Sequence, residues 1–195
     1  MIAVSLLTLG TRNPHKVKEI ERLLAPAGID VRPLPEGTRL PPEAGSTFAE
    51  NALPKARATA QATRGPAIAD DSGIEAEALG GVPGVRSARY AGPAATDEEN
   101  LAKLIREAPA GDRLRYVCAL AYVDPRAGQE RVFIGECRGH LAAAPRGSGG
   151  FGYDPAFLPD GQWQERTMAE LSDAEKDSIS HRGHAVRQLL DWLSR

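Results

Sequence analysis

Strands and helices alternate in the first 71 residues of the chain, and this alternation restricts the fold more than any other feature. Such alternation is typical of parallel strands that are joined by helices. Later in the chain, two apolar segments flank residues 124–128 and predict an antiparallel hairpin. The sequence therefore predicts an α/β fold with a mixed β-sheet flanked by helices. The predicted strands are 2–9, 29–34, 66–71, 114–123 and 131–139.

Capping patterns mark where the predicted helices begin. Asn13 followed by Pro14 is typical of a helix start, and Gly28 of the end of that helix. Pro54 lies inside the second helix, where it predicts a bend near Glu50. Capping boxes are predicted for Thr47 with Glu50 and for Ser172 with Glu175. The second helix is predicted to begin at the Thr47 cap and to reach about Thr63, and further helices are predicted at 97–107 and 180–193.

Length and composition favour one domain, or one domain with two lobes, because 195 residues that are 42% hydrophobic can bury a sizeable core. A net charge of −2 argues against a nucleic-acid partner, so any phosphate site must be a local basic cluster. Cys118 and Cys137 lack metal-ligand spacing and are predicted to be buried thiols of a reducing cytosol, with a disulfide as the alternative. The apolar residues 1–10 are too short for a membrane span and have no basic leader.

Two adjacent carboxylates, Asp70 and Asp71, follow the apolar run 67–69 and precede Ser72-Gly73. This pattern predicts a strand that ends in a tight loop, where ligands of α/β sheets gather. Two negative charges so close together are costly unless they share a cation or a proton. Carboxylate oxygens suit magnesium, and magnesium usually binds together with phosphate. The alternative is a simple turn in which one aspartate caps the backbone.

Two further segments place cations at predicted helix starts, where positive charge opposes the helix dipole. A bound phosphate would turn that conflict into stabilisation. The alternative in both cases is a capped helix with solvated side chains. The segments are Thr11–Lys16 with Lys18, and Lys176 with Ser180–Gly183.

Two other patterns point to a ligand site. Asn51 and Lys55 share a helix face, and Glu43 lies in the preceding loop, where it could also be merely solvated. Within the segment 147–155, residues 147–152 match G-x-G-x-x-G, but Tyr153-Asp154-Pro155 follows and continues no helix. Because the dinucleotide-binding motif must open a helix, that fold is excluded. The glycines of this segment instead indicate a loop that approaches a ligand, with Phe151 as a stacking face, or else a mobile loop with a core aromatic.

Six stretches together resemble the Ham1/inosine triphosphate pyrophosphatase family. The resemblance implies an elongated α/β fold of a single domain, 1–195, with a central cleft between two lobes, an architecture shared with Maf-like proteins. It also implies a magnesium-dependent, cytoplasmic homodimer that clears ITP, dITP and XTP from the nucleotide pool by hydrolysis to the monophosphate and pyrophosphate. The stretches run in order from about residue 8 to 184: TRNPHK, TFAENALPKA, AIADDSG, ALGGVPGVRSARYAG, GSGGFGYDP and AEKDSISHRG.

The same resemblance implies the site residues. Asp71 would accept a proton from the attacking water and hold Mg²⁺ together with Glu43. Because Pro42 replaces a second acidic residue that the family often has, Glu43 is the remaining metal candidate in its loop. Implied substrate-binding residues are Thr11, Arg12, Asn13, Pro14, His15, Lys16 and Lys55 for the triphosphate, Ser72 beside the reacting group, Phe151, Gly152, Tyr153 and Asp154 for the base, and Lys176, His181 and Arg182 for base reading and closure.

Two other functions stay open at this point. One is a Maf-like pyrophosphatase that acts on modified pyrimidine nucleotides. The other is a nucleotide sensor that binds without turnover, with Phe151 stacking on a base. If the substrate is a purine nucleotide, hydrogen-bond donors directed at a 6-keto oxygen would reject adenine, because its 6-amino group leaves them unpaired. Guanine carries the same 6-keto group, so these donors would not reject it.

Overall fold

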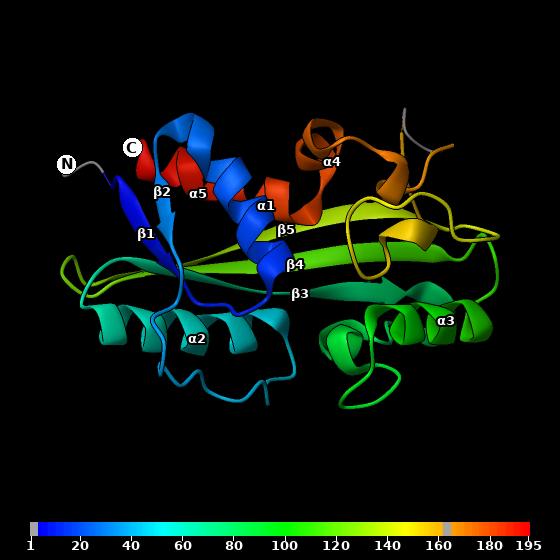
Figure 1. The fold of residues 1–195 in the computed structure, drawn as a ribbon, viewed down its shortest axis with the longest axis horizontal. Coiled ribbons are helices and arrows are strands. Elements are labelled where there is room, and N and C mark those ends of the chain that lie inside the picture. The colour runs from blue at the N-terminus through cyan, green and yellow to red at the C-terminus, as the bar shows by residue number, and fades with distance from the viewer. Residues whose placement is uncertain (1–3, 162–164) are drawn as a thin grey trace. The chain divides into compact units, whose positions relative to one another are not determined.

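The computed structural model describes residues 4–161 and 165–195. One six-stranded sheet has the order β2-β1-β3-β4-β5-β6 (Figure 1). Parallel pairing joins β1 to β2 and to β3, and antiparallel pairing joins β5 to β6. The prediction of a mixed sheet flanked by helices is therefore confirmed. The strands are β1 Leu6–Leu9, β2 Asp30–Arg32, β3 Ala67–Ala76, β4 Arg113–Asp124, β5 Gln129–Leu141 and β6 Phe157–Pro159.

The chain divides into two compact units, and β3, β4 and β5 each contribute residues to both. Unit 1 contains Met1–Asp71, Cys118–Gly135 and His181–Arg195, and unit 2 contains Ser72–Val117 and Glu136–Ser180. The helices are α1 Pro14–Leu24, α2 Phe48–Thr63, α3 Asp97–Glu107, α4 Asp173–Ile179 and α5 His181–Leu193.

In unit 1, helices cover both faces of the sheet. Figure 1 shows α1 and α5 on one face and α2 on the other. Leu7 and Leu9 of β1 are fully buried in a core that includes Ile20 and Leu24 of α1 and Leu189 of α5. Because both faces are covered, residues of both orientations along a strand are buried.

In unit 2, α3 lies on one face of the sheet and α4 on the other (Figure 1). The core includes Ile74, Leu104, Tyr116 and Phe157, and the ring centroids of Tyr116 and Phe157 lie 4.6 Å apart. This second core allows the strands to continue beyond unit 1 as buried segments.

The prediction that a strand ends at Asp70 and Asp71 is wrong. β3 continues through Ser72 and Gly73 to Ala76, with Asp70 0% and Asp71 5% exposed. The strand continues because basic side chains of other elements pair with both carboxylates, and because unit 2 covers the remainder of β3. It is β1 that ends near the aspartates, since Gly10, just past its end, donates to the Ile68 carbonyl at 2.7 Å.

Most other predicted elements are confirmed with shifted ends. The first strand begins at Leu6, and Ile2 lies outside the described residues. The first helix ends at Leu24 and continues as a 3₁₀ turn to Gly28, whose φ of 69° is left-handed. The helix α2 is continuous through Pro54, and the bend near Glu50 stays a prediction. The predicted helix 97–107 matches α3.

The cysteines are free and buried on neighbouring strands, as predicted for thiols rather than a disulfide. Burial raises the pKa of both Cys118 and Cys137 to about 12, so both stay protonated at neutral pH. Among the described residues, no helix has the length and hydropathy that crossing a membrane requires.

Candidate active site

The two aspartates of β3 lie in different electrostatic surroundings. Successive side chains of a strand point to opposite faces, and here each face supplies its own cations. Asp70 pairs with Lys16 at 2.9 Å and with Arg182 at 3.2 Å. Asp71 accepts a hydrogen bond from Asn51 at 3.0 Å and lies 3.5 Å from the Lys55 ammonium. The aspartates therefore have separate tasks, one toward α1 and α5 and the other toward α2.

The segment between β1 and α1 is a capped helix start. The Asn13 side-chain oxygen accepts from the backbone N–H of His15 at 2.9 Å and of Lys16 at 3.3 Å. Pro14 is the first helical residue, as predicted. The sequence left a capped helix and an anion site as alternatives, and the cap is confirmed. Thr11 and the cap take up the N–H groups of Asn13, His15 and Lys16, and Pro14 has none. An anion at this helix start would therefore depend on side chains such as Lys16.

Other atoms hold this segment in place. Thr11 accepts from the Asn13 N–H at 3.2 Å, and Arg12 donates to the Thr38 carbonyl at 2.8 Å. Gly10 is required for close approach, because a Cβ there would lie 2.4 Å from the Thr59 hydroxyl oxygen. The loop therefore lies directly on α2, next to the turn that carries Lys55.

Asp70 is the centre of a buried ion network. Arg182 is 1% exposed and pairs with both Asp70 and Glu19, and Glu19 is itself 6% exposed. Burial alone would raise the pKa of Asp70, but Lys16 and Arg182 hold it well below its usual value. Asp70 thus stays ionised and fixes the positions of the Lys16 ammonium and the Arg182 guanidinium.

Asp71 of β3 belongs to a second group of charges, which includes Lys55 of α2 and Glu43. The Lys55 ammonium lies 2.6 Å from Glu43 and 3.5 Å from Asp71, so a single cation contacts both carboxylates. Asn51 donates to Asp71 and accepts from the Gly45 N–H at 2.8 Å, which ties the loop of Glu43 to β3. The predicted shared face of Asn51 and Lys55 on α2 is confirmed.

The pKa values of Asp71 and Lys55 are both shifted upward. Burial raises the pKa of Asp71, and Glu43 adds to this, while Lys55 opposes it. Burial alone would lower the pKa of Lys55, but Asp70, Asp71 and Glu43 together raise it. A carboxylate whose pKa is raised toward neutrality is suited to accept a proton.

Glu43 and Asp71 fit a magnesium ion that substrate completes. Both are acceptor-only carboxylates already arranged around a cation. Magnesium is commonly bound by one or two carboxylates together with substrate phosphates and water. Among the residues that the structure describes, no three His, Cys, Asp or Glu side chains group as a metal site.

The glycine-rich loop in unit 2 is held by Asp154, which is 3% exposed. Its carboxylate accepts from Lys176 at 2.6 Å, from the Phe151 N–H at 2.9 Å and from the Tyr116 hydroxyl at 3.0 Å. Gly150 has a φ of 67°, and a Cβ there would lie 2.0 Å from the Asp154 carboxylate. The loop is therefore built around the carboxylate.

This arrangement presents Phe151 for stacking. Its ring is half-buried, and the Lys176 ammonium lies 5.2 Å from the ring centroid. Tyr153 donates to the Ser87 carbonyl at 2.7 Å, and the Gly152 N–H donates to Asp97 at 3.0 Å. The two residues that follow Phe151 are thus held by fixed contacts.

The remaining predicted residues are placed as follows. Ser72 is half-buried in β3, where unit 2 begins, and His15 is exposed on α1. His181 is 5% exposed at the start of α5, beside Arg182. Within unit 1 the structure brings Lys55 together with the metal candidates Glu43 and Asp71. Within unit 2 it brings together Asp154, Lys176 and Phe151.

Sequence reasoning missed the roles of three buried polar groups. Glu19 is a carboxylate on the apolar face of α1 next to Ile20, a placement that signals a buried partner. Asn51 was placed on the face of Lys55, but its bond to Asp71 was not foreseen. Tyr116 gave no signal, because a tyrosine in an apolar strand looks like any core residue.

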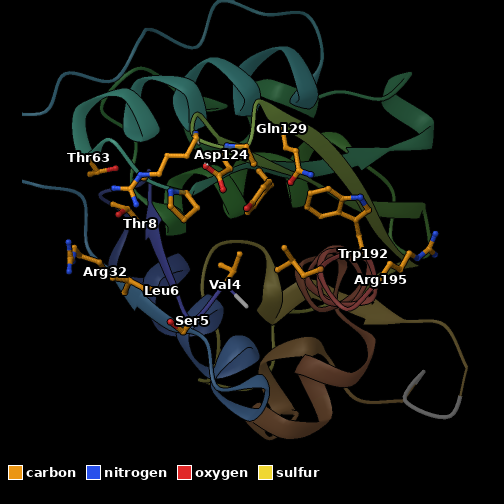
Figure 2. Close-up of a pocket in the computed structure, with 16 residues that line it drawn as sticks. Val4, Ser5, Leu6, Thr8, Arg32, Thr63, Asp124, Gln129, Trp192 and Arg195 are labelled. Atoms are coloured by element: carbon orange, nitrogen blue, oxygen red, sulfur yellow. Dashed lines mark hydrogen bonds between the residues drawn. The ribbon is translucent and has the colours of Figure 1, made fainter. Parts of the chain in front are cut away.

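A cavity of about 760 Å³ lies elsewhere in unit 1. Figure 2 shows Leu6, Thr8 and Trp192 in its walls, with Arg32 and Arg195 also among the lining residues. None of the predicted site residues lines it. The candidate active site is therefore a set of ion pairs on β3 and its neighbouring helices, separate from this cavity.

The fold and the site define an α/β protein in which Lys16 of α1, Lys55 of α2 and the metal-suited carboxylates Glu43 and Asp71 gather beside β3. This arrangement is suited to phosphate chemistry. Comparison with known proteins gives the family: the Ham1 family model matches residues 7–192, and the chain belongs to the Ham1 family. The resemblance noted from six sequence stretches is thereby confirmed.

Similar proteins match over nearly their whole length. A dITP/XTP pyrophosphatase of Frankia alni is 50% identical over 198 residues, covering 96% of each chain. One from Geobacillus kaustophilus is 47% identical, covering 94% of this chain and 91% of its own. Among solved structures, a HAM1 protein from Coxiella burnetii superposes with a TM-score of 0.85 at 38% identity, covering 97% of this chain and 98% of that one.

Proposed function

We propose that this protein hydrolyses the non-standard purine nucleoside triphosphates ITP, dITP and XTP to the nucleoside monophosphate and pyrophosphate. The observation that carries the proposal is the buried group in which Lys55 contacts Glu43 and Asp71 beside the capped start of α1. The names of the similar pyrophosphatases supply the substrate class.

The triphosphate would be held by unit 1. Lys16 and Lys55 supply positive charge, and Asn13 and Thr11 hold the helix start from which Lys16 extends. Phosphoryl-type transfer depends mainly on positioning and charge neutralisation, which these side chains provide without covalent catalysis. Arg12, Pro14 and His15 would contribute by shaping this loop.

We propose Mg²⁺ as the cofactor, held by Glu43 and Asp71. Bound there, it would neutralise charge on the phosphate oxygens. Asp71 would accept the proton of the attacking water, a task that suits its raised pKa. Ser72 follows Asp71 in β3 and would contact the substrate near the reacting group.

In unit 2, the base would be held by residues of the glycine-rich loop and by Lys176 of α4. Phe151 offers a stacking face, and Gly152, Tyr153 and Asp154 fix the loop that carries it. For His181 and Arg182 of α5, in unit 1, base reading and closure are the roles that the family resemblance implies. In the structure Arg182 also pairs with Asp70 and Glu19, so its role in the base site includes positioning.

We also propose that the protein acts as a homodimer in the cytoplasm and forms a single domain. The buried free thiols support a reducing compartment. Light scattering coupled to size-exclusion chromatography tests the dimer, which a mass of about 20.8 kDa for the eluted protein would contradict.

A substrate panel with product identification tests the proposed function. With Mg²⁺ present, ITP, dITP and XTP are expected to yield pyrophosphate and monophosphate, and ATP to be a poor substrate. Preferred turnover of modified UTP or dTTP would support a Maf-like activity instead. Tight ITP binding with unchanged nucleotide would support a sensor, and release of single phosphate would contradict the reaction type.

A further inference from the structure

We propose that Lys55 is a resident cation that occupies the metal position of the nucleotide-free protein, so that divalent metal binds tightly only when a triphosphate draws Lys55 away. This inference rests on the proposed function, because it assumes that Glu43 and Asp71 hold the metal. It adds a regulatory step at that site, namely an exchange of one cation for another.

The geometry places the ammonium between the two carboxylates. Lys55 lies 2.6 Å from Glu43 and 3.5 Å from Asp71, and its side chain is 8% exposed. A divalent ion bound by the same two carboxylates would meet this positive charge at close range. Like charges at such a distance repel strongly in a water-poor site, so metal and ammonium exclude each other.

The surrounding bonds hold the carboxylates in place for either cation. Asn51 donates to one oxygen of Asp71, and Lys55 contacts the other. The bond from the Gly45 N–H to Asn51 fixes the loop that carries Glu43. A Cβ at Gly45 would lie 2.6 Å from the Glu50 Cβ, so this close approach needs glycine. Exchange of the cation therefore requires movement of the Lys55 side chain and not of the backbone.

The Lys55 ammonium is held at 2.6 Å from Glu43 and 3.5 Å from Asp71. To leave these carboxylates it needs another anionic partner, and the phosphates of a bound triphosphate provide one.

The two lysines differ in what they would leave behind. If Lys16 turned toward a phosphate, Asp70 would keep Arg182 at 3.2 Å. If Lys55 turned toward a phosphate, Glu43 and Asp71 would lose the cation that they share. An arriving metal replaces that charge, so metal and triphosphate binding are positively coupled, and the coupling acts equally in both directions.

The test measures Mn²⁺ binding to the nucleotide-free protein by electron paramagnetic resonance of the free ion at pH 7.5. Lys55→Met is expected to bind Mn²⁺ on the order of tenfold more tightly than the unsubstituted protein, within the usual range of such couplings. Lys55→Arg keeps the charge and is expected to stay within about twofold. The matched control is Arg57→Met, which removes an exposed cation from the same helix and should leave Mn²⁺ affinity unchanged.

Equal or weaker Mn²⁺ binding by Lys55→Met would overturn the proposal, as would a tenfold gain in Arg57→Met. Urea unfolding of each variant confirms that the folded protein is compared, and Lys55→Gln replaces Lys55→Met if the latter does not fold. Failure of the proposed function is seen separately, as absence of pyrophosphate release from ITP by the unsubstituted protein.

Discussion

Replacing Arg182 by methionine should be among the most destabilising single changes in unit 1. The guanidinium is 1% exposed and neutralises two buried carboxylates, Asp70 at 0% and Glu19 at 6% exposure. Removing one partner of a buried ion pair costs about 3–5 kcal/mol, because the remaining charge stays buried and unpaired. Asp70 keeps Lys16 at 2.9 Å, so the loss falls mainly on Glu19. We expect a decrease of about 4 kcal/mol in the free energy of unfolding.

Urea unfolding at pH 7 measures this decrease, with Arg57→Met as the matched control. Arg57 pairs with Glu130 at 2.6 Å, but both side chains are exposed, and an exposed pair contributes about 0.2–1 kcal/mol. Adding Glu19→Gln to Arg182→Met should cost less than the sum of the single changes, because both changes remove the same Glu19–Arg182 ion pair. A loss below about 1 kcal/mol for Arg182→Met would refute the reasoning.

Four further predictions follow from the same contacts. The pKa of Asp70 lies below its ordinary 3.8, so the ionised carboxylate stabilises the fold above that pH, and this stabilisation is lost as the pH falls below it. In unfolding measurements at decreasing pH, the difference in free energy of unfolding between the unsubstituted protein and Asp70→Asn should therefore become smaller. Asn51→Ala should lower kcat for ITP on the order of tenfold with an unchanged fold, and an unchanged kcat would contradict its positioning role. Gly150→Ala should weaken ITP binding, seen by titration calorimetry, because its Cβ would displace the Asp154 carboxylate. Arg182→Ala should reduce the ratio of kcat/KM for ITP over ATP, and an unchanged ratio would remove this residue from base selection.

Local patterns predicted the parts of the fold that depend on nearby residues. The caps at Asn13, Thr47 and Ser172 are confirmed, because each depends on atoms within three residues. The helix over 97–107 is confirmed for the same reason, with apolar spacing and a capping box in one short segment.

The same local reasoning failed at Asp70 and Asp71. A pair of carboxylates looks like a strand end unless distant cations neutralise it, and Arg182 lies 112 residues further along the chain. Glu19 was missed because its partner Arg182 is 163 residues away. Long-range charge pairs leave no local signal, so the sequence indicated the strand and the chemistry at the aspartates but not that the strand continues past them to Ala76.

The most direct test of the account compares ITP hydrolysis by the unsubstituted protein and by Asp71→Asn, with Mg²⁺ present and pyrophosphate measured. The matched control is Asp191→Asn, an exposed carboxylate on α5. The account predicts that Asp71→Asn still binds ITP and unfolds cooperatively but loses at least about a thousandfold in kcat, while Asp191→Asn keeps its rate. Near-normal pyrophosphate release by Asp71→Asn would contradict the central claim that this carboxylate activates water and holds the metal.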